Sequence, residues 1–261
     1  MISFPLLRQT IKSNLKFLCA FTFILCVFLV VMCYVFTPST VEDLKVVTKG
    51  TALGHIFGNN GTLISFMSNS FYALMAIVFP MVYSIMVGNR LIAEKVDRGS
   101  MACLLSTPLT RRKITLTSAF YFVTSLMVMW GTASFIGYLA ADIFQKGALD
   151  TDTFLMMNVG CFLYHFVISS ICFCCSCIFN TSKGSLTLGA GIPIAFFVIS
   201  LFIKLSDDLD VLKYFTLNTL FDTQKIIEGS GYMNSFMYMI GIGICLYSIG
   251  IITFQKKDLP L

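Results

Sequence analysis

The sequence predicts an all-α polytopic membrane protein with six transmembrane helices, and two observations carry this prediction. Of its 261 residues, 57% are hydrophobic and only 12% are charged, whereas a soluble domain carries about 25% charged residues. Six apolar stretches without Asp, Glu, Lys or Arg also have the length of roughly 20 residues that a spanning helix needs. This composition excludes a soluble enzyme and a disordered protein. The six stretches are Phe17–Phe36, Leu63–Gly88, Leu116–Ala141, Phe154–Phe179, Gly184–Ile203 and Ser235–Phe254.

The segments between these stretches are short. The longest of them, residues 204–234, cannot form a separate soluble domain. We therefore expect residues 1–261 to form a single transmembrane domain. The first stretch is longer than the apolar core of a signal peptide and has no small-residue cleavage site after it, so we expect a retained anchor.

The charges predict the orientation. With both termini in the cytoplasm, the cytoplasmic side would hold most of the 18 Lys and Arg residues but only Glu94, Asp97 and Asp258 among the acids. This is the asymmetry of the positive-inside rule. The net charge of +5 is therefore a signal of membrane orientation and does not indicate nucleic-acid binding.

The N-terminal residues 1–16 have the spacing of an amphipathic helix. Such a helix lies in the headgroup layer, where anionic lipids attract its basic side chains. The alternative is an ordinary basic flank of the first span. The apolar stripe is Phe4, Leu7, Ile11, Leu15 and Leu18, and the basic stripe is Arg8, Lys12 and Lys16.

The second span contains a line of side chains at helical spacing: Ser65, Asn69, Tyr72 and Phe79. Polar groups in hydrocarbon seek partners or a water-filled cavity, so this line is either the lining of a translocation pathway or a packing face. Pro80 follows in the same helix and favours a kink.

The loop of residues 89–115 is the most informative segment. Glu94 and Arg98 have the spacing of a helical ion pair, and Gly99 is expected to end that helix. Met101, Leu104 and Leu105 form an apolar face that no predicted span covers. Thr107 or Thr110 can cap the next helix, with Pro108 as a stop or a first-turn residue. A short helix with an apolar knob is suited to docking into a groove of another protein.

The outer loop, residues 204–234, contains two apolar segments, Val211–Phe215 and Leu217–Phe221. We expect them to form short helices that dip into the outer membrane interface, rather than a soluble cap.

Several kinds of chemistry lack their sequence motifs. No Gly-x4-Gly-Lys-Ser/Thr run is present to bind a nucleotide, and no His-Glu-x-x-His is present for a zinc site. His165 is the one histidine in a span, and a helix-to-helix hydrogen bond is favoured for it over catalysis. The cluster Cys172–Cys177 is interpreted as packing rather than as a metal site. No span carries an ion-coupling charge, so we expect energy to enter through a partner.

Two adjacent motifs in the loop resemble those of a known family. Glu94-x-x-Asp97-x-Gly99-Ser100 is followed by Leu104-Leu105-x-x-Pro108-x-Thr110-Arg111-x-x-Ile114. This pattern resembles the ABC-2 type permeases, the membrane subunits of ABC exporters. The family pattern usually reads Glu-x-x-Glu-x-Gly-Thr, followed by a Leu pair, Pro-x-Ser-Arg, an Ile and a Lys. Asp97, Ser100 and Thr110 are conservative departures from this pattern, and Ser118 stands where the Lys is common.

The resemblance implies that the loop carries a coupling helix for a separate ATPase subunit, and that two permeases pair above two ATPases. No cofactor is then expected in this chain, because ATP and Mg bind to the partner. The cargo would be an amphipathic peptide or another hydrophobic molecule exported across the cytoplasmic membrane, and export of sodium, a drug or a polysaccharide stays open as an alternative. The coupling residues implied are Glu94, Asp97, Arg98, Gly99, Ser100, Met101, Leu104, Leu105, Pro108 and Arg111.

Two alternatives remain open at the level of sequence. A substrate-binding membrane subunit of a vitamin-type importer also has about six spans and would bind a small molecule without ATP. An intramembrane enzyme would depend on His165.

Overall fold

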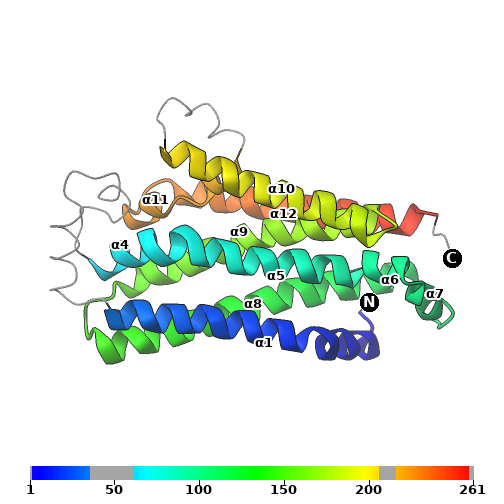
Figure 1. Ribbon diagram of the computed structural model, residues 1–261, viewed down its shortest axis with the longest axis horizontal. Helices are drawn as coiled ribbons and strands as arrows, with labels where there is room; N and C mark the ends of the chain where they lie inside the picture. The colour runs from blue at the N-terminus through cyan, green and yellow to red at the C-terminus, as the bar shows by residue number, and fades with distance from the viewer. Residues whose placement is uncertain (1, 36–61, 206–215, 259–261) are drawn as a thin grey trace.

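A computed structural model describes residues 2–35, 62–205 and 216–258, and all regular structure in these ranges is helical. Six helical elements are long and apolar enough to cross a membrane. They run side by side as one bundle (Figure 1), which confirms the predicted fold class. The six are α1 (Phe4–Val35), the continuous unit α4, η1 and α5 (Leu63–Met67, Ser68–Met75 and Ala76–Leu91), α8 (Arg111–Phe144), α9 (Thr151–Ile178), α10 (Ser182–Leu205) and α12 (Tyr232–Lys256).

Helix α9 forms the centre of the bundle. It packs against α5, α8, α10 and α12, and 78% of its most apolar stretch is buried, against 22% for α1 and 17% for α10. Small residues permit the closest crossings: a Cβ at Gly243 of α12 would lie 2.3 Å from the Phe166 ring of α9. The buried residues of α9 lie on all sides of the helix, as is typical of a helix that other helices surround.

The N-terminal segment is not a separate element. Residues Phe4–Val35 form one uninterrupted helix, so the structure has no boundary between the predicted interfacial helix, 1–16, and the first span. The physical reason is that Pro5 stands in the first turn, where proline is tolerated, and no glycine or proline follows it within the helix. The location of these first turns in the headgroup layer stays a prediction.

The second span contains a wide turn that the spacing did not predict. Residues Ser68–Met75 form a π-helix between α4 and α5. Hydrogen bonds from i to i+5 widen each turn, so spacings of three and four residues do not keep side chains on one face here. The regular α-helical spacing that was assumed for Ser65, Asn69, Tyr72 and Phe79 is therefore interrupted by the π-helix.

The outer loop folds onto the end of the bundle. Within its described part, η3 (Leu217–Leu220) is the short helix expected for the second apolar segment, and a further short helix that was not predicted, α11 (Thr223–Ile227), follows it. Phe221 is buried against the ring of Tyr164. The segment Val211–Phe215 lies outside the described residues. Entry of this loop into the membrane interface stays a prediction.

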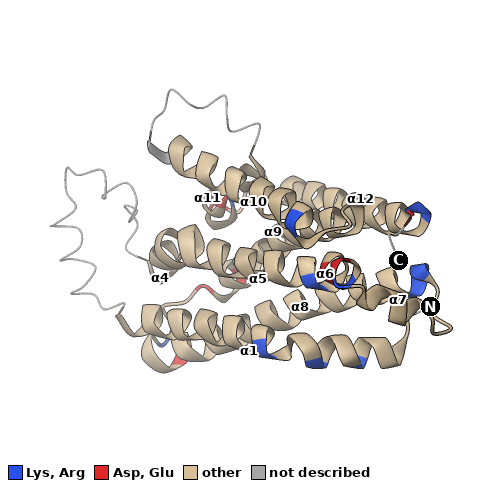
Figure 2. Ribbon diagram, turned by 45° about the vertical axis from the view of Figure 1, so that its right-hand side comes forward, with Lys and Arg blue, Asp and Glu red and all other residues tan. Residues whose placement is uncertain are grey.

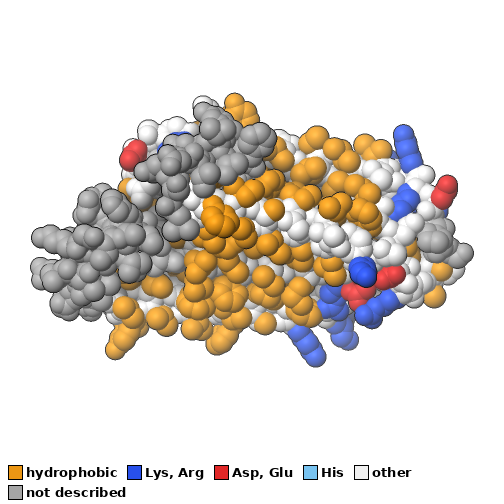
Figure 3. Space-filling model, turned by 45° about the horizontal axis from the view of Figure 1, so that its top comes forward, with side chains coloured by type: hydrophobic (Ala, Val, Ile, Leu, Met, Phe, Trp, Pro, Cys, Tyr) orange, Lys and Arg blue, Asp and Glu red, His pale blue; other side chains and the backbone are white. Residues whose placement is uncertain are grey.

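Charge separates the two ends of the bundle. Lys and Arg side chains gather at the end that holds both termini, the start of α8 and two further short helices, α6 (Ala93–Asp97) and α7 (Ser100–Leu105) (Figure 2). We call this the basic end. A broad apolar belt covers the side of the bundle before the charged side chains begin (Figure 3). This is the surface of a multi-pass membrane protein.

Candidate functional site

The basic end carries a short segment that leaves the bundle, formed by α6 and α7. Helix α5 ends at Leu91, and the backbone of Ile92 then departs from helical geometry (φ −130°, ψ −62°). Helices α6 and α7 are separated by Gly99, which has φ 70°. This left-handed conformation is open to glycine at little cost, so the predicted end of the first short helix at Gly99 is confirmed.

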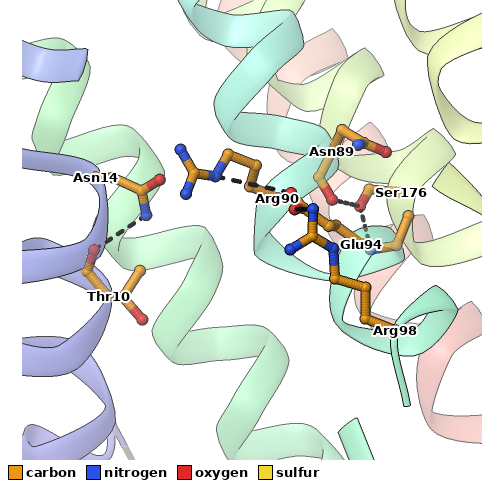
Figure 4. Close-up of polar contacts among 8 residues, drawn as sticks. Thr10, Asn14, Asn89, Arg90, Glu94, Arg98 and Ser176 are labelled. Atoms are coloured by element: carbon orange, nitrogen blue, oxygen red, sulfur yellow. Dashed lines mark hydrogen bonds and ion pairs between the residues drawn. The ribbon is translucent and has the colours of Figure 1, made fainter. Parts of the chain in front are cut away.

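A serine of α9 holds the break between α5 and α6. The Oγ of Ser176 accepts a hydrogen bond from the backbone N–H of Ala93 at 2.9 Å and donates to the carbonyl of Asn89 at 3.4 Å. Ser176 is fully buried, and a buried backbone group without a partner is costly. Ser176 thus supplies partners on both sides of the interruption and fixes α6 to the central helix (Figure 4).

Glu94 is the centre of an ion-pair cluster on α6. Its Oε1 lies 2.8 Å from Nη2 of Arg98, which confirms the predicted pair, and its Oε2 lies 3.7 Å from Nε of Arg90. The guanidinium of Arg90 also lies 4.7 Å from the ring centre of Phe17 on α1. One carboxylate therefore connects the last turn of α5 to α6 (Figure 4).

The expected apolar docking face is wrong in one residue. Met101 is fully buried and belongs to the core, while Leu104 and Leu105 are half-buried against it. Because α7 has only six residues and lies close to the bundle, its largest apolar side chain turns inward, where burial is favourable. The exposed part of α7 and its following turn is formed instead by Ala102, Cys103, Ser106, Thr107 and Pro108.

The other motif residues fix the segment in place. A carboxylate oxygen of Asp97 accepts from the backbone N–H of Ser182 at 3.2 Å, at the start of α10, where a negative charge favours the helix N-terminus. The Oγ of Ser100 donates to the carbonyl of Lys95. Thr110 caps α8, as expected, by accepting from Lys113 N–H at 3.4 Å.

Arg111 joins the start of α8 to the end of α12. Its Nη1 donates to the carbonyl of Lys257 at 2.5 Å. The ammonium of Lys257 in turn donates to the carbonyl of Cys177 at 3.3 Å, and desolvation lowers the pKa of Lys257. The motif residues thus form one connected assembly with the ends of α8, α9 and α12.

Comparison with known proteins shows the family of the chain. A family model of the ABC-2 family transporter proteins matches residues 7–259. The chain belongs to the ABC-2 transporter family. It is the permease subunit of an ABC transporter, whose ATPase is a separate partner. A search among curated proteins finds no match.

The residues suggested for a pathway in this permease lie mostly inside the subunit. Ser65 and Tyr72 are buried, whereas Asn69 and Phe79 are half-buried. Asn69 donates its side-chain amide to the carbonyl of Ser65 at 3.1 Å, and the Phe79 ring packs on Phe28 of α1. Within one subunit, the burial of Ser65 and Tyr72 favours the packing interpretation for these two residues.

His165 connects two helices of the permease. Its ring nitrogens lie 2.8 Å from the carbonyl oxygen of Cys161 in α9 and 3.1 Å from that of Ile77 in α5. The contacts agree with the helix-to-helix hydrogen bond that was favoured for His165 over catalysis.

The cysteine cluster of α9 lies at close helix crossings. The thiol of Cys172 donates to the carbonyl of Gly189 in α10 at 3.2 Å. A Cβ added at Gly88 of α5 would lie 2.7 Å from the Cβ of Cys172. Small side chains at such crossings let helices approach closely. Among the described residues, no group of three or more His, Cys, Asp or Glu is arranged to hold a metal ion.

Sequence analysis missed two contributors to this site. Ser176 was treated as part of the cysteine cluster, and Arg90 was counted only as a basic loop residue. A signal existed for Arg90, which precedes Glu94 by the same four residues that separate Glu94 from Arg98. For Ser176 the sequence carries no such signal, because its backbone partner at Ala93 is 83 residues away.

Proposed function

We propose that this permease is the membrane half of an ATP-driven exporter and that the α6–α7 segment is the docking site of the ATPase. The observation that carries the proposal is the attachment of this segment. It protrudes at the basic end, yet Ser176 and Glu94 fix it to α9 and α5. A rigid attachment of this kind suits the transmission of ATPase movement into the spanning helices.

The docking surface is proposed to be polar. Its centre would be the exposed turn after α7, Ser106, Thr107 and Pro108, with Cys103 beside it. Met101 supports this surface from within and does not reach the partner. The basic end would face the cytoplasm, in agreement with the positive-inside rule, and ATP and Mg would bind to the ATPase alone.

A pair of permeases with two ATPases is the proposed assembly. Large side chains, among them Phe71, Phe122, Phe154 and Phe173, fill the interior of the described bundle. A bulky cargo would therefore pass along an outer face that a second copy closes. The apolar belt and the uncharged spans support a hydrophobic or amphipathic cargo such as a peptide.

The experiment is co-purification of a tagged permease from native membranes in mild detergent. We expect a P-loop ATPase with vanadate-sensitive activity, and we expect Thr107→Arg to reduce its recovery several-fold. Thr151→Arg is the matched control, because it makes the same exchange at an exposed position of the opposite end. Equal recovery with both variants would contradict docking at α7, and absence of any ATPase would contradict the exporter.

A further inference from the structure

A pocket of about 370 Å³ lies between the first turns of α1 and the segment α6–α7. It is lined from α1 by polar residues that include Gln9, Ser13 and Asn14. On the opposite side it is lined by Arg90, Lys95 and Arg98, together with Glu94. Several of these residues hold the α6–α7 segment in place, but the pocket that they line has no assigned role.

The pocket carries an excess of positive charge. Arg90, Lys95 and Arg98 bring three positive charges, whereas Glu94 brings one negative charge and already contacts both arginines. Only Nε of Arg90 faces Glu94, at 3.7 Å. Its two terminal nitrogens reach across toward Asn14 of α1 (Figure 4). Guanidinium groups frequently bind phosphate oxygens in a bidentate manner.

Asn14 is a second, independent sign of a ligand. Its side chain is only 4% exposed and lines the pocket. The amide nitrogen donates to the carbonyl of Thr10 at 3.0 Å, whereas the buried carbonyl oxygen Oδ1 has no hydrogen-bond partner among the described residues. A buried acceptor without a donor is costly, so the pocket offers a site for a hydroxyl beside its cations.

The position of the pocket indicates where such a ligand comes from. On the outer side of α1, Phe4, Ile11 and Leu15 are exposed, and exposed apolar side chains on a helix of this protein face lipid. Leu6 and Leu104 give the pocket an apolar margin. We therefore expect the cations to lie at the level of the headgroups, next to the surface that lipid tails would cover.

We propose that this pocket binds the headgroup of an anionic phospholipid from the leaflet at the basic end, a phosphodiester that carries a free hydroxyl. The phosphate would lie between Arg90, Lys95 and Arg98, and the hydroxyl would donate to Oδ1 of Asn14. The lipid would then join α1 to the α6–α7 segment. This inference does not require the ATPase, so it can fail or hold independently of the proposed function.

The test uses the full chain, purified without partners. Native mass spectrometry would measure retention of phosphatidylglycerol, with phosphatidylcholine as the zwitterionic reference. Asn14→Asp is nearly isosteric and places a carboxylate beside Arg90. Lys12→Gln removes the same amount of charge from the exposed face of the same helix and is the matched control. We expect Asn14→Asp to weaken phosphatidylglycerol binding by about tenfold or more, because the new carboxylate would pair with Arg90 and repel the phosphate. Lys12→Gln should change the binding by less than about twofold.

A second readout is the thiol of Cys103, which is exposed and lines the pocket. Peptide mapping separates its alkylation from that of the other cysteines. Compared with phosphatidylcholine nanodiscs, phosphatidylglycerol nanodiscs should slow the alkylation of Cys103 in the wild type but not in the Asn14→Asp variant.

Three results would overturn the proposal. Equal loss of lipid in both variants would mean diffuse charge attraction. Protection of Cys103 by inorganic phosphate but not by phosphatidylglycerol would mean a soluble anion. Protection of Cys103 only after addition of the ATPase would mean that the pocket binds a side chain of the ATPase instead of a lipid.

Discussion

The attachment of α6 to α9 can be tested by removing one buried hydroxyl, that of Ser176. Ser176→Ala removes the acceptor of Ala93 N–H at 2.9 Å and the donor to the Asn89 carbonyl at 3.4 Å. The first of these is the stronger bond by its length. Ser170→Ala is the matched control, since Ser170 is equally buried in α9 but its hydroxyl donates to the carbonyl of Val167 within the same helix.

The magnitude follows from the groups left unpaired. Loss of the partner of a buried backbone N–H costs about 1–3 kcal/mol, which corresponds to a change of about 5–150-fold in an equilibrium constant. Ser170→Ala leaves the Val167 carbonyl to its own helical donor, so we expect a cost of less than about 0.5 kcal/mol, within the usual range of substitutions away from such features.

Hydrogen exchange of peptides that cover Ala93–Asp97 is the assay, with the permease in nanodiscs. Ser176→Ala should raise local opening of α6 by the factor above, while exchange in the middle of α9 stays unchanged. In the complex, ATP hydrolysis should also respond less to cargo. Identical exchange of α6 in Ser176→Ala and Ser170→Ala would refute the reasoning.

Three further predictions concern other parts of the bundle. Gly243→Ala should lower the free energy of unfolding by about 1–3 kcal/mol through overpacking against Phe166, whereas Gly241→Ala, which meets open space, should not lower the midpoint of thermal unfolding. Glu94→Gln should release Arg98 and reduce coupling of ATP hydrolysis to cargo, at a stability cost of at most about 1 kcal/mol because Arg98 is 75% exposed. Asp150 caps α9, and the hydroxyl and N–H of Thr153 hold its pKa below the ordinary value; its stabilisation is thus present above about pH 4 and lost as the pH falls further. Asp150→Asn should flatten this pH dependence of thermal unfolding.

The sequence predicted the features that depend on local chemistry. Hydropathy located all six spans, although α8 begins at Arg111 rather than at Leu116 because its cap, Thr110, lies outside the apolar stretch. Glycine at position 99 and the Glu94–Arg98 spacing predicted the two short helices. Each of these follows from residues within one or two turns of one another.

The remaining features depend on contacts between distant segments. The inward position of Met101 is decided by the bundle beneath α7, which the loop sequence does not contain. The burial of Thr10 and Asn14 on α1 was not predicted, because the spacing of the apolar and basic residues of this helix is the more regular pattern. The π-helix at Ser68–Met75 changes the register that the pathway argument assumed. Sequence spacing alone could not provide any of these.

The central claim is that the ATPase docks on the turn after α7, and site-specific photo-crosslinking tests it most directly. A photoreactive residue would replace Thr107 at the basic end or, as the control, Tyr138, which is exposed on the apolar side of α8. The account predicts a crosslink to a P-loop ATPase from position 107, changed in yield by ATP and vanadate, and none from position 138. Crosslinks to the ATPase that arise elsewhere and never from position 107 would contradict it.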